Sequence, residues 1–169
     1  MNQRPSEEEY AGNSGEYIRL VPDGNIIDIL FAQEKQMTEL LASLTESQGT
    51  YRYAEGKWTL KEVVGHIADA ERVMTYRLLR FARGDQTPLT GFDQELFMPP
   101  FGSWTTEQLA EDYRAVRQST ITLLRGLPAE AWTRKGTANE LSITVRALAY
   151  GIAGHELHHM GVIRNRYLS

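Results

Sequence analysis

The stretch from residue 142 to residue 167 constrains the fold more than any other part of the sequence. Its inward-facing positions follow one another at steps of 3, 4, 3, 4 and 3 residues: Val145, Leu148, Ile152, His155, His159 and Val162. This is the a/d spacing of a helix that packs along its whole length against other helices. The segment therefore predicts a long bundle helix that carries two histidines on its buried face.

Three further segments show helical periodicity, with apolar residues recurring at steps of three and four. They cover roughly residues 25–47, 59–83 and 105–126. The second opens with Thr59 and Glu62, a capping box in which the two side chains satisfy backbone N–H groups reciprocally. No segment shows the sustained alternation that is typical of strands, so none is required. The sequence predicts an all-α four-helix bundle.

About twenty residues, from Gly84 to Trp104, separate the second helix from the third. Prolines and glycines recur in this connection (Pro88, Gly91, Pro99, Pro100 and Gly102), so we expect no helix there. A loop of this length fits a bundle if it crosses from one end to the other. A helix of about 25 residues is about 37 Å long, and twenty extended residues span up to about 66 Å. The expected topology is up-down-down-up, with a long crossover between helices two and three.

Composition excludes several kinds of chemistry. The chain has no cysteine, which rules out disulfides, thiolate ligands and a cysteine nucleophile. A chain of 169 residues buries a core without a stabilising metal, so a metal site is expected to be functional. The net charge is -4, with 18 basic and 22 acidic residues interspersed. We therefore expect no nucleic-acid partner and no binding to an anionic membrane.

The beginning of the chain lacks the features of a targeting segment. It has neither the basic nor the apolar region of a signal peptide, and no stretch approaches the roughly 18 apolar residues of a membrane span. We expect a cytoplasmic protein. Residues 1–16 are polar and rich in glutamate, and we expect them to form a flexible arm. Residues 17–169 are expected to form a single domain.

Three of the four histidines form a candidate metal site. His155 and His159 are four residues apart, so they lie on one helix face about one turn apart. His66 lies near the start of its helix and the pair lies near the end of theirs, so an antiparallel arrangement brings all three level. The alternative is histidines satisfied within the core, but two in succession on an apolar face are costly without a shared partner. Three neutral imidazoles with a vacant position suit Zn, Ni or Fe(II) at a catalytic site.

Residues 155–159 also read H-E-L-H-H, which has the H-E-x-x-H form of zinc metalloproteases. Only ten residues follow His159, and residue 165 is Asn165, so the third ligand of that class is missing and a protease is disfavoured. Glu156 is the candidate catalytic residue, as a base or as a partner of a ligand. The alternative is an exposed carboxylate on the helix surface. His158 flanks the buried face and is a weaker candidate.

Other residues carry weaker expectations. Asp69, one turn after His66, is placed to accept a hydrogen bond from a ligand imidazole, and a solvated carboxylate is the alternative. Glu34 interrupts the apolar face of the first helix, where a pair with an arginine is the preferred interpretation. Six aromatic residues are either core residues or the lining of a pocket: Trp58, Phe92, Phe97, Phe101, Trp104 and Trp132.

Two stretches together resemble the DinB/YfiT-like superfamily of metal-binding four-helix bundles, which is unrelated to the DNA polymerase that shares its name. Residues 57–72 read KWTLKEVVGHIADAER, and residues 154–159 read GHELHH. The likeness extends over roughly residues 17–168. The resemblance implies that one histidine of the second helix and two of the last bind a divalent metal. These positions correspond to His66, His155 and His159.

The resemblance also implies a range of activities. The family includes transferases that use low-molecular-weight thiols such as bacillithiol, mycothiol-dependent isomerases and metal-dependent hydrolases, often as homodimers. We predict an S-transferase that activates such a thiol for attack on a small electrophile. The absence of cysteine permits this reaction, because the thiol would come from solution, but does not require it. One alternative is hydrolysis of a small amide or ester, with Glu156 or His158 moving the proton. A second is a non-enzymatic metal-binding stress or sensor protein.

Overall fold

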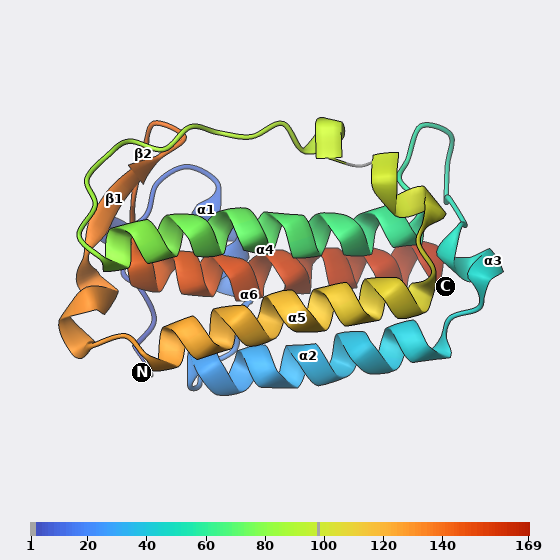
Figure 1. The fold of residues 1–169 in the computed structure, drawn as a ribbon, viewed down its shortest axis with the longest axis horizontal. Helices are drawn as coiled ribbons and strands as arrows, with labels where there is room; N and C mark the ends of the chain where they lie inside the picture. The colour runs from blue at the N-terminus through green and yellow to red at the C-terminus, as the bar shows by residue number, and fades with distance from the viewer. Residues whose placement is uncertain (1–2, 98) are drawn as a thin grey trace.

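The computed structural model describes residues 3–97 and 99–169, and four long helices lie side by side in it (Figure 1). They are α2 (Ile26–Ser43), α4 (Leu60–Ala82), α5 (Thr106–Arg125) and α6 (Val145–Val162). Helices α4 and α5 run in the same direction, and α2 and α6 run opposite to them (Figure 1). The predicted all-α bundle with up-down-down-up topology is confirmed.

The long helices begin where the sequence supplies a cap. Thr59 and Thr105 form capping boxes with Glu62 and Gln108 at the starts of α4 and α5. Thr144 accepts a hydrogen bond from a backbone N–H in the first turn of α6. These bonds satisfy donors that the first turn of a helix leaves without a partner. A separate short helix, α3 (Glu46–Gly49), follows α2.

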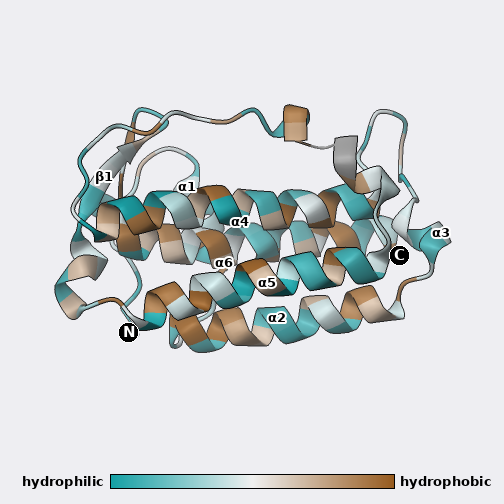
Figure 2. Ribbon diagram, in the orientation of Figure 1, coloured by the Kyte–Doolittle hydropathy of each residue, from teal (hydrophilic) through white to brown (hydrophobic). Residues whose placement is uncertain are grey.

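Helices α2 and α5 each bury one face, whereas α6 is buried on all sides from Ala147 to Glu156. Figure 2 shows hydrophobic and hydrophilic residues interleaved along the four helices. The buried apolar side chains form two clusters, one around Leu30, Leu78 and Leu148 and the other around Met37, Val63 and Met160. No helix in the described residues is both long and apolar enough to cross a membrane.

A short β-hairpin precedes α6, although the sequence did not require strands. Strand β1 (Lys135–Ala138) pairs antiparallel with β2 (Leu141–Thr144). Asn139 and Glu140 join them with φ of 51° and 64°, the positive values that a two-residue hairpin turn needs. The strands are four residues long and the turn contains no glycine, so the usual sequence signals for a hairpin are weak.

The crossover runs along the outside of α4 (Figure 1). It begins hydrogen-bonded to the hairpin, because Leu89 donates to the carbonyl of Thr137 and accepts from the N–H of Asn139, both at 2.9 Å. The expectation of no helix is wrong for two 3-10 turns, Gln94–Phe97 and Pro99–Ser103. Proline is tolerated in the first turn of such elements, where its missing N–H has no partner to lose. Met98 of the crossover lies outside the described residues.

The N-terminal segment packs against the bundle, unlike the flexible arm expected for residues 1–16. Residues 1 and 2 lie outside the described residues. Helix α1 (Ser14–Leu20) spans the expected boundary and packs on α6. Glu9 is buried, and its carboxylate accepts hydrogen bonds from Arg146 and from the hydroxyl of Thr144. Contacts with distant residues, including this ion pair and the hydrogen bonds of Arg4 to the carbonyls of Ile18 and Val21, therefore hold a segment whose composition is that of a solvated arm.

Candidate metal centre

Three histidine side chains meet between α4 and α6. Nε2 of His155 lies 3.0 Å from Nε2 of His66 and 3.1 Å from Nε2 of His159. One ring nitrogen from each of the three lies within 4.8 Å of the others. The antiparallel arrangement of α4 and α6 brings together the residues that the sequence singled out.

A glycine precedes His66 and another precedes His155, and each lets a further segment approach its helix. A Cβ on Gly65 would lie 2.3 Å from the ring of Phe101. A Cβ on Gly154 would lie 2.1 Å from the carbonyl oxygen of Tyr17. The crossover therefore packs closely on α4 beside His66, and α1 packs closely on α6 beside His155.

The three imidazoles fit one metal ion better than a hydrogen-bonded core. A neutral imidazole has one donor and one acceptor nitrogen, so Nε2 of His155 cannot form full hydrogen bonds with both His66 and His159. Two nitrogens bound tetrahedrally to one zinc ion at about 2.0–2.1 Å are about 3.3 Å apart. The observed separations of 3.0 and 3.1 Å are close to this value. A shared ion would satisfy all three nitrogens at once.

Burial keeps the three imidazoles in the form that binds metal. It lowers the pKa of His66 to about 4 and, helped by the neighbouring histidines, the pKa of His159 to about 3. Burial and the neighbouring histidines also hold the pKa of His155 well below its usual range. Neutral imidazole is the ligand form, so near neutral pH protons do not compete for these nitrogens.

Asp69 and Glu34 have other partners. Asp69 accepts a hydrogen bond from Arg72 at 3.0 Å, and Nδ1 of His66 is buried without a partner among the described residues. The expected bond from a ligand imidazole to Asp69 is therefore not formed. Glu34 accepts a hydrogen bond from Gln118 of α5, where the sequence favoured an arginine.

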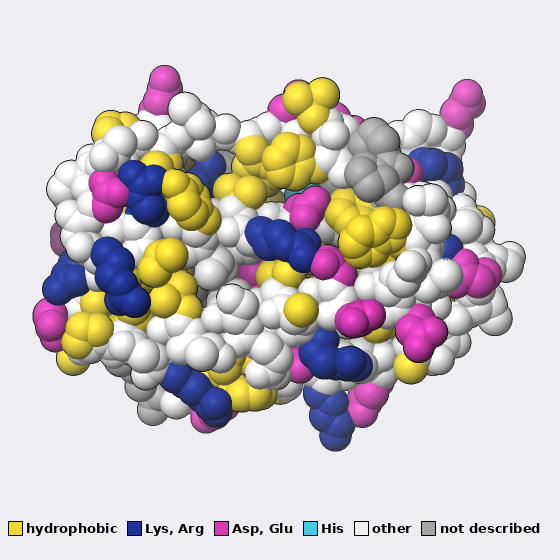
Figure 3. Space-filling model, viewed as in Figure 1, with side chains coloured by type: hydrophobic (Ala, Val, Ile, Leu, Met, Phe, Trp, Pro, Cys, Tyr) yellow, Lys and Arg dark blue, Asp and Glu magenta, His cyan; other side chains and the backbone are white. Residues whose placement is uncertain are grey.

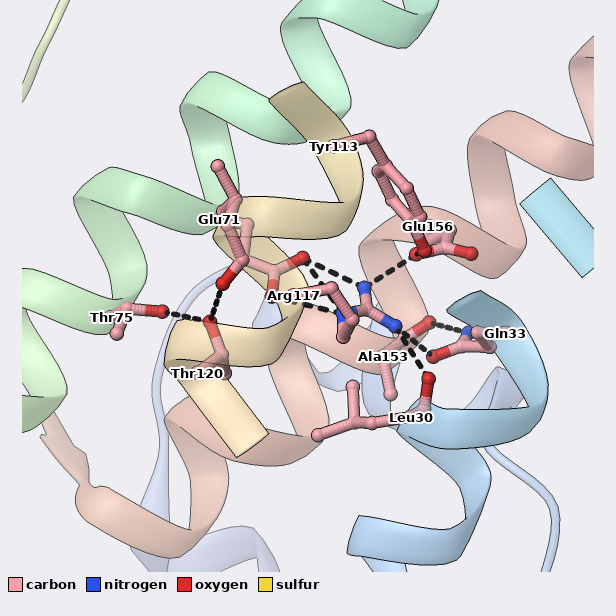
Figure 4. A network of polar contacts seen from close by, with 10 residues as sticks. Leu30, Gln33, Glu71, Thr75, Tyr113, Arg117, Thr120, Ala153 and Glu156 are labelled. Carbon is pink, nitrogen blue, oxygen red and sulfur yellow. Dashed lines mark hydrogen bonds and ion pairs between the residues drawn. The ribbon is translucent and has the colours of Figure 1, made fainter. Parts of the chain in front are cut away.

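Glu156 is buried and belongs to a second polar cluster (Figure 4). Its Oε2 accepts hydrogen bonds from the hydroxyl of Tyr113 at 2.8 Å and from Nη2 of Arg117 at 2.5 Å. Burial raises the pKa of Glu156 although Arg117 opposes that rise. The alternative of an exposed surface carboxylate is wrong, and the catalytic role of Glu156 stays a prediction.

Arg117 is the centre of that second cluster, which the sequence analysis missed. Its Nε and Nη2 donate to Glu71 at 2.7–3.1 Å. Its Nη1 donates to the carbonyl of Leu30 at 3.1 Å and to Gln33 at 3.3 Å. The cluster thus ties α5 to α2, α4 and α6. A signal was present, because Tyr113, Arg117, Thr120 and Leu124 follow one another at steps of 4, 3 and 4.

A cavity of about 180 Å³ lies beside His155. Tyr17 lines it, and the Tyr17 ring meets the rings of His155 and His158 edge-on at 5.4 and 5.5 Å between centroids. His158 itself is exposed. Figure 3 shows a small area of histidine at the bottom of a narrow gap between acidic and hydrophobic side chains.

The six aromatic residues take different places. The ring of Trp58 lies 4.9 Å from that of His66, and its Nε1 donates to Glu95 of the crossover. Phe101, which packs at Gly65, is buried. The other four lie in the core or along the crossover: Trp132 is buried, Phe92 and Phe97 pack on each other, and Trp104 packs on Phe101.

A bundle in which histidines from two antiparallel helices converge in this way defines a class, the metal-binding four-helix bundles. The model of the DinB superfamily matches residues 30–163. The chain belongs to the DinB superfamily.

Two relatives are similar along most of their length. A protein of Oceanobacillus iheyensis, provisionally named a metal-dependent hydrolase, is 26% identical over 133 residues, which cover 76% of each chain. A protein of Bacillus pumilus with the same kind of name is 26% identical over 141 residues, covering 81% of this chain and 80% of its own.

Two solved structures share the fold. YfiT from Bacillus subtilis is described as a probable metal-dependent hydrolase with an unusual four-helix bundle topology. It superposes with a TM-score of 0.66 at 19% identity, over 96% of this chain and 93% of YfiT. The mycothiol-dependent maleylpyruvate isomerase superposes with a TM-score of 0.67 at 13% identity, over 85% of this chain and 61% of its own. At these identities the two structures establish the fold.

Proposed function

We propose that this protein is a divalent-metal-dependent enzyme that transfers a small electrophilic group to the sulfur of an external low-molecular-weight thiol. The observation that carries the proposal is the convergence of His66, His155 and His159 through their Nε2 atoms, at 3.0 and 3.1 Å. The names of the sequence relatives support metal dependence. The isomerase of the same fold depends on mycothiol, which supports a thiol co-substrate.

The residues of the site have distinct roles in this proposal. When bound, a divalent metal such as Zn, Ni or Fe acts as a Lewis acid that lowers the pKa of a coordinated thiol or water. His66, His155 and His159 hold it and, as three ligands, leave a position for a small molecule. Trp58 covers the ring of His66, and Tyr17 borders the cavity beside His155. His66 and His155 are buried, whereas His159 is partly exposed.

The absence of a carboxylate from the described lining of the cavity beside His155 favours a thiol over water as the nucleophile. Glu156 accepts hydrogen bonds from Arg117 and Tyr113, and no Asp or Glu is among the described residues that line the cavity. Hydrolysis ordinarily uses a side chain to move the proton of water, whereas an activated thiol is already largely thiolate near neutral pH. Because the chain has no cysteine, the thiol comes from a second small molecule.

Hydrolysis of a small amide or ester is the second candidate, and the names of the relatives favour it. His158 is the group that best suits proton transfer there, because it is exposed and packs on Tyr17 at the cavity. If neither reaction occurs, the protein is a metal-binding stress or sensor protein without catalysis.

The homodimer and the cytoplasmic location stay predictions. Light scattering on the purified protein tests whether it is a homodimer.

The metal site is tested by elemental analysis. The purified protein is loaded with Zn, Ni or Fe(II), desalted and measured by mass spectrometry of the metals. We expect one ion per chain in the wild type and in His158→Ala, which removes an exposed neighbour. We expect almost none in His159→Ala. Full occupancy in His159→Ala would contradict the site.

The reaction is tested on the metal-loaded protein. We expect metal-dependent conjugation of monochlorobimane to bacillithiol or mycothiol, with no turnover in His159→Ala. Cleavage of small esters without any thiol, and no conjugation, would favour the hydrolase. Inactivity in both assays would favour the sensor protein.

A further inference from the structure

The cavity beside His155 contains one charged side chain whose partner is missing. Arg77 of α4 is the only Lys, Arg, Asp or Glu among the described residues that line it. Its neighbours on the same helix are paired, Arg72 with Asp69 and Asp112, and Arg80 with Asp85. Arg77 has no acidic partner in the described part of the chain.

Local contacts hold the Arg77 guanidinium but leave most of its donors free. Nη2 donates to the carbonyl of Thr90 at 2.9 Å, and the guanidinium lies 6.0 Å from the ring centroid of Phe92. Both contacts come from the crossover, whose start is bonded to the hairpin at Leu89. Arginine has five N–H donors in a planar fork that matches a carboxylate. A half-buried guanidinium with a single protein acceptor is therefore suited to bind an anion.

The remaining walls of the cavity are mainly apolar, and one of them follows α6. Leu148, Gly151 and His155 line it at steps of three and four along α6, which corresponds to about 10 Å of helix. Met74 and Ile143 are on other walls. The volume of about 180 Å³ is below the 300–1,000 Å³ that drug-sized ligands occupy. The space fits a narrow molecule with a short apolar body.

We propose that this cavity binds a small carboxylic acid, with its carboxylate on Arg77, its apolar chain along α6 and its far end beside His155. One guanidinium matches the single charge of a carboxylate, and the cavity supplies no second cation for a phosphate. The identification of this acid as the substrate rests on the proposed function, in which the end of the acid beside His155 carries the electrophilic group. The anion site itself does not depend on the metal.

The test uses metal-free protein labelled with ¹³C at the methionine methyl groups, so that a carboxylate cannot bind a metal instead. Met74 lines the cavity, and Met37 lies in the other apolar cluster. Hexanoate, hexanamide and hexyl phosphate are titrated in turn. We expect hexanoate to shift the Met74 signal, saturably and without moving Met37, about 10-fold more tightly than hexanamide.

Two variants locate the charge. In Arg77→Gln we expect hexanoate to bind about as weakly as hexanamide, whereas Arg80→Gln, a change at a paired arginine of the same helix, keeps the wild-type preference. Equal affinities of hexanoate and hexanamide in the wild type would overturn the proposal, as would full hexanoate affinity in Arg77→Gln. Tighter binding of hexyl phosphate than of hexanoate would overturn the carboxylate in favour of a phosphate. If Arg77→Gln does not fold, the wild-type comparison decides.

This experiment is independent of the proposed function. A loss of metal binding in the elemental analysis would leave the Met74 titration unaffected. Conversely, failure of hexanoate to bind would leave the histidine site and the thiol reaction standing, with another substrate.

Discussion

Two polar clusters lie inside the same bundle and differ in how their hydrogen-bonding groups are satisfied. Around Arg117, every guanidinium nitrogen donates to an acceptor: Nε and Nη2 donate to the carboxylates of Glu71 and Glu156, and Nη1 donates to the carbonyl of Leu30 and to Gln33. Around His155, three ring nitrogens face one another, and Nδ1 of His66 has no partner among the described residues. The first cluster satisfies its own hydrogen-bonding groups, whereas the second leaves ring nitrogens that a bound ion would satisfy.

The difference separates stability from function in the interior of the bundle. Buried polar groups cost free energy unless they are paired. A cluster that satisfies itself therefore fixes how the helices meet, and its loss acts on folding. A cluster that leaves its nitrogens unsatisfied is suited to bind a ligand, and its loss is expected to act on binding. We expect variants of the Arg117 cluster to lower the free energy of unfolding, and variants of the histidine cluster to lower metal affinity.

The largest effect is expected from Arg117→Met. The substitution leaves Glu71 and Glu156 buried without their cation, which is expected to lower the free energy of unfolding by about 3–5 kcal/mol. Urea unfolding at pH 7 measures it, with Arg114→Met on the exposed face of the same helix as the control. If Arg117→Met is as stable as Arg114→Met, the cluster does not hold the helices together.

The next effect is expected on metal binding. A metal that binds only the folded state raises its stability by about 2.7 kcal/mol at 100 times its dissociation constant. We expect this increase in the thermal unfolding of the wild type and of His158→Ala, and its loss in His159→Ala. An equal metal-induced shift in His159→Ala would show that the histidine cluster is not the binding site.

The histidine cluster also predicts a dependence of stability on pH. Burial lowers the pKa of His66 from its ordinary 6.5 to about 4, so between these values the unfolded chain binds a proton that the folded chain does not. The metal-free protein is then fully stabilised above pH 6.5 and loses stability as the pH falls toward 4. For His66 the loss is about 2 kcal/mol between pH 7 and 5.

Urea unfolding at pH 7, 6 and 5 measures this loss. Glutamine at position 66 does not titrate, so His66→Gln lacks the contribution of His66 and the fall in its stability should be smaller than that of the wild type. Parallel falls in the two proteins would mean that His66 is not kept neutral by the fold.

The smallest effect is expected from Glu156→Gln, at the residue that joins the two regions in sequence. Glutamine keeps an oxygen for Tyr113 and Arg117 but loses the charge, so we expect a loss of about 1–2 kcal/mol in stability. Metal affinity should change by no more than a few fold. A fall of 100-fold or more in turnover with unchanged stability would instead support the catalytic role predicted from the H-E-x-x-H pattern.

Features that depend on local sequence were predictable. The starts of α4, α5 and α6 follow from Thr59, Thr105 and Thr144, each of which caps the helix that it precedes. The pairing of His155 with His159 follows from helical spacing alone. The topology followed from the length of the crossover, because a chain of that length can return along the bundle.

Features that depend on distant partners were not predictable. Glu9 meets Arg146 from 137 residues away, and this contact helps to hold a segment expected to be a flexible arm. Glu156 meets Arg117 across 39 residues, which places it in the ion cluster. The hairpin was missed because its strands are short and its turn, at residues 139 and 140, has no glycine.

The sequence by itself determined the four helices, their order and direction, and the three histidines that face one another. Helical periodicity and capping depend on residues a few positions apart, so they can be predicted from the sequence alone. The tertiary structure alone decided which polar side chains inside the fold find protein partners, as Arg117 does, and which lack an acidic partner among the described residues, as Arg77 does. That outcome depends on whether an acceptor from another helix reaches each donor, and only the packed bundle specifies it.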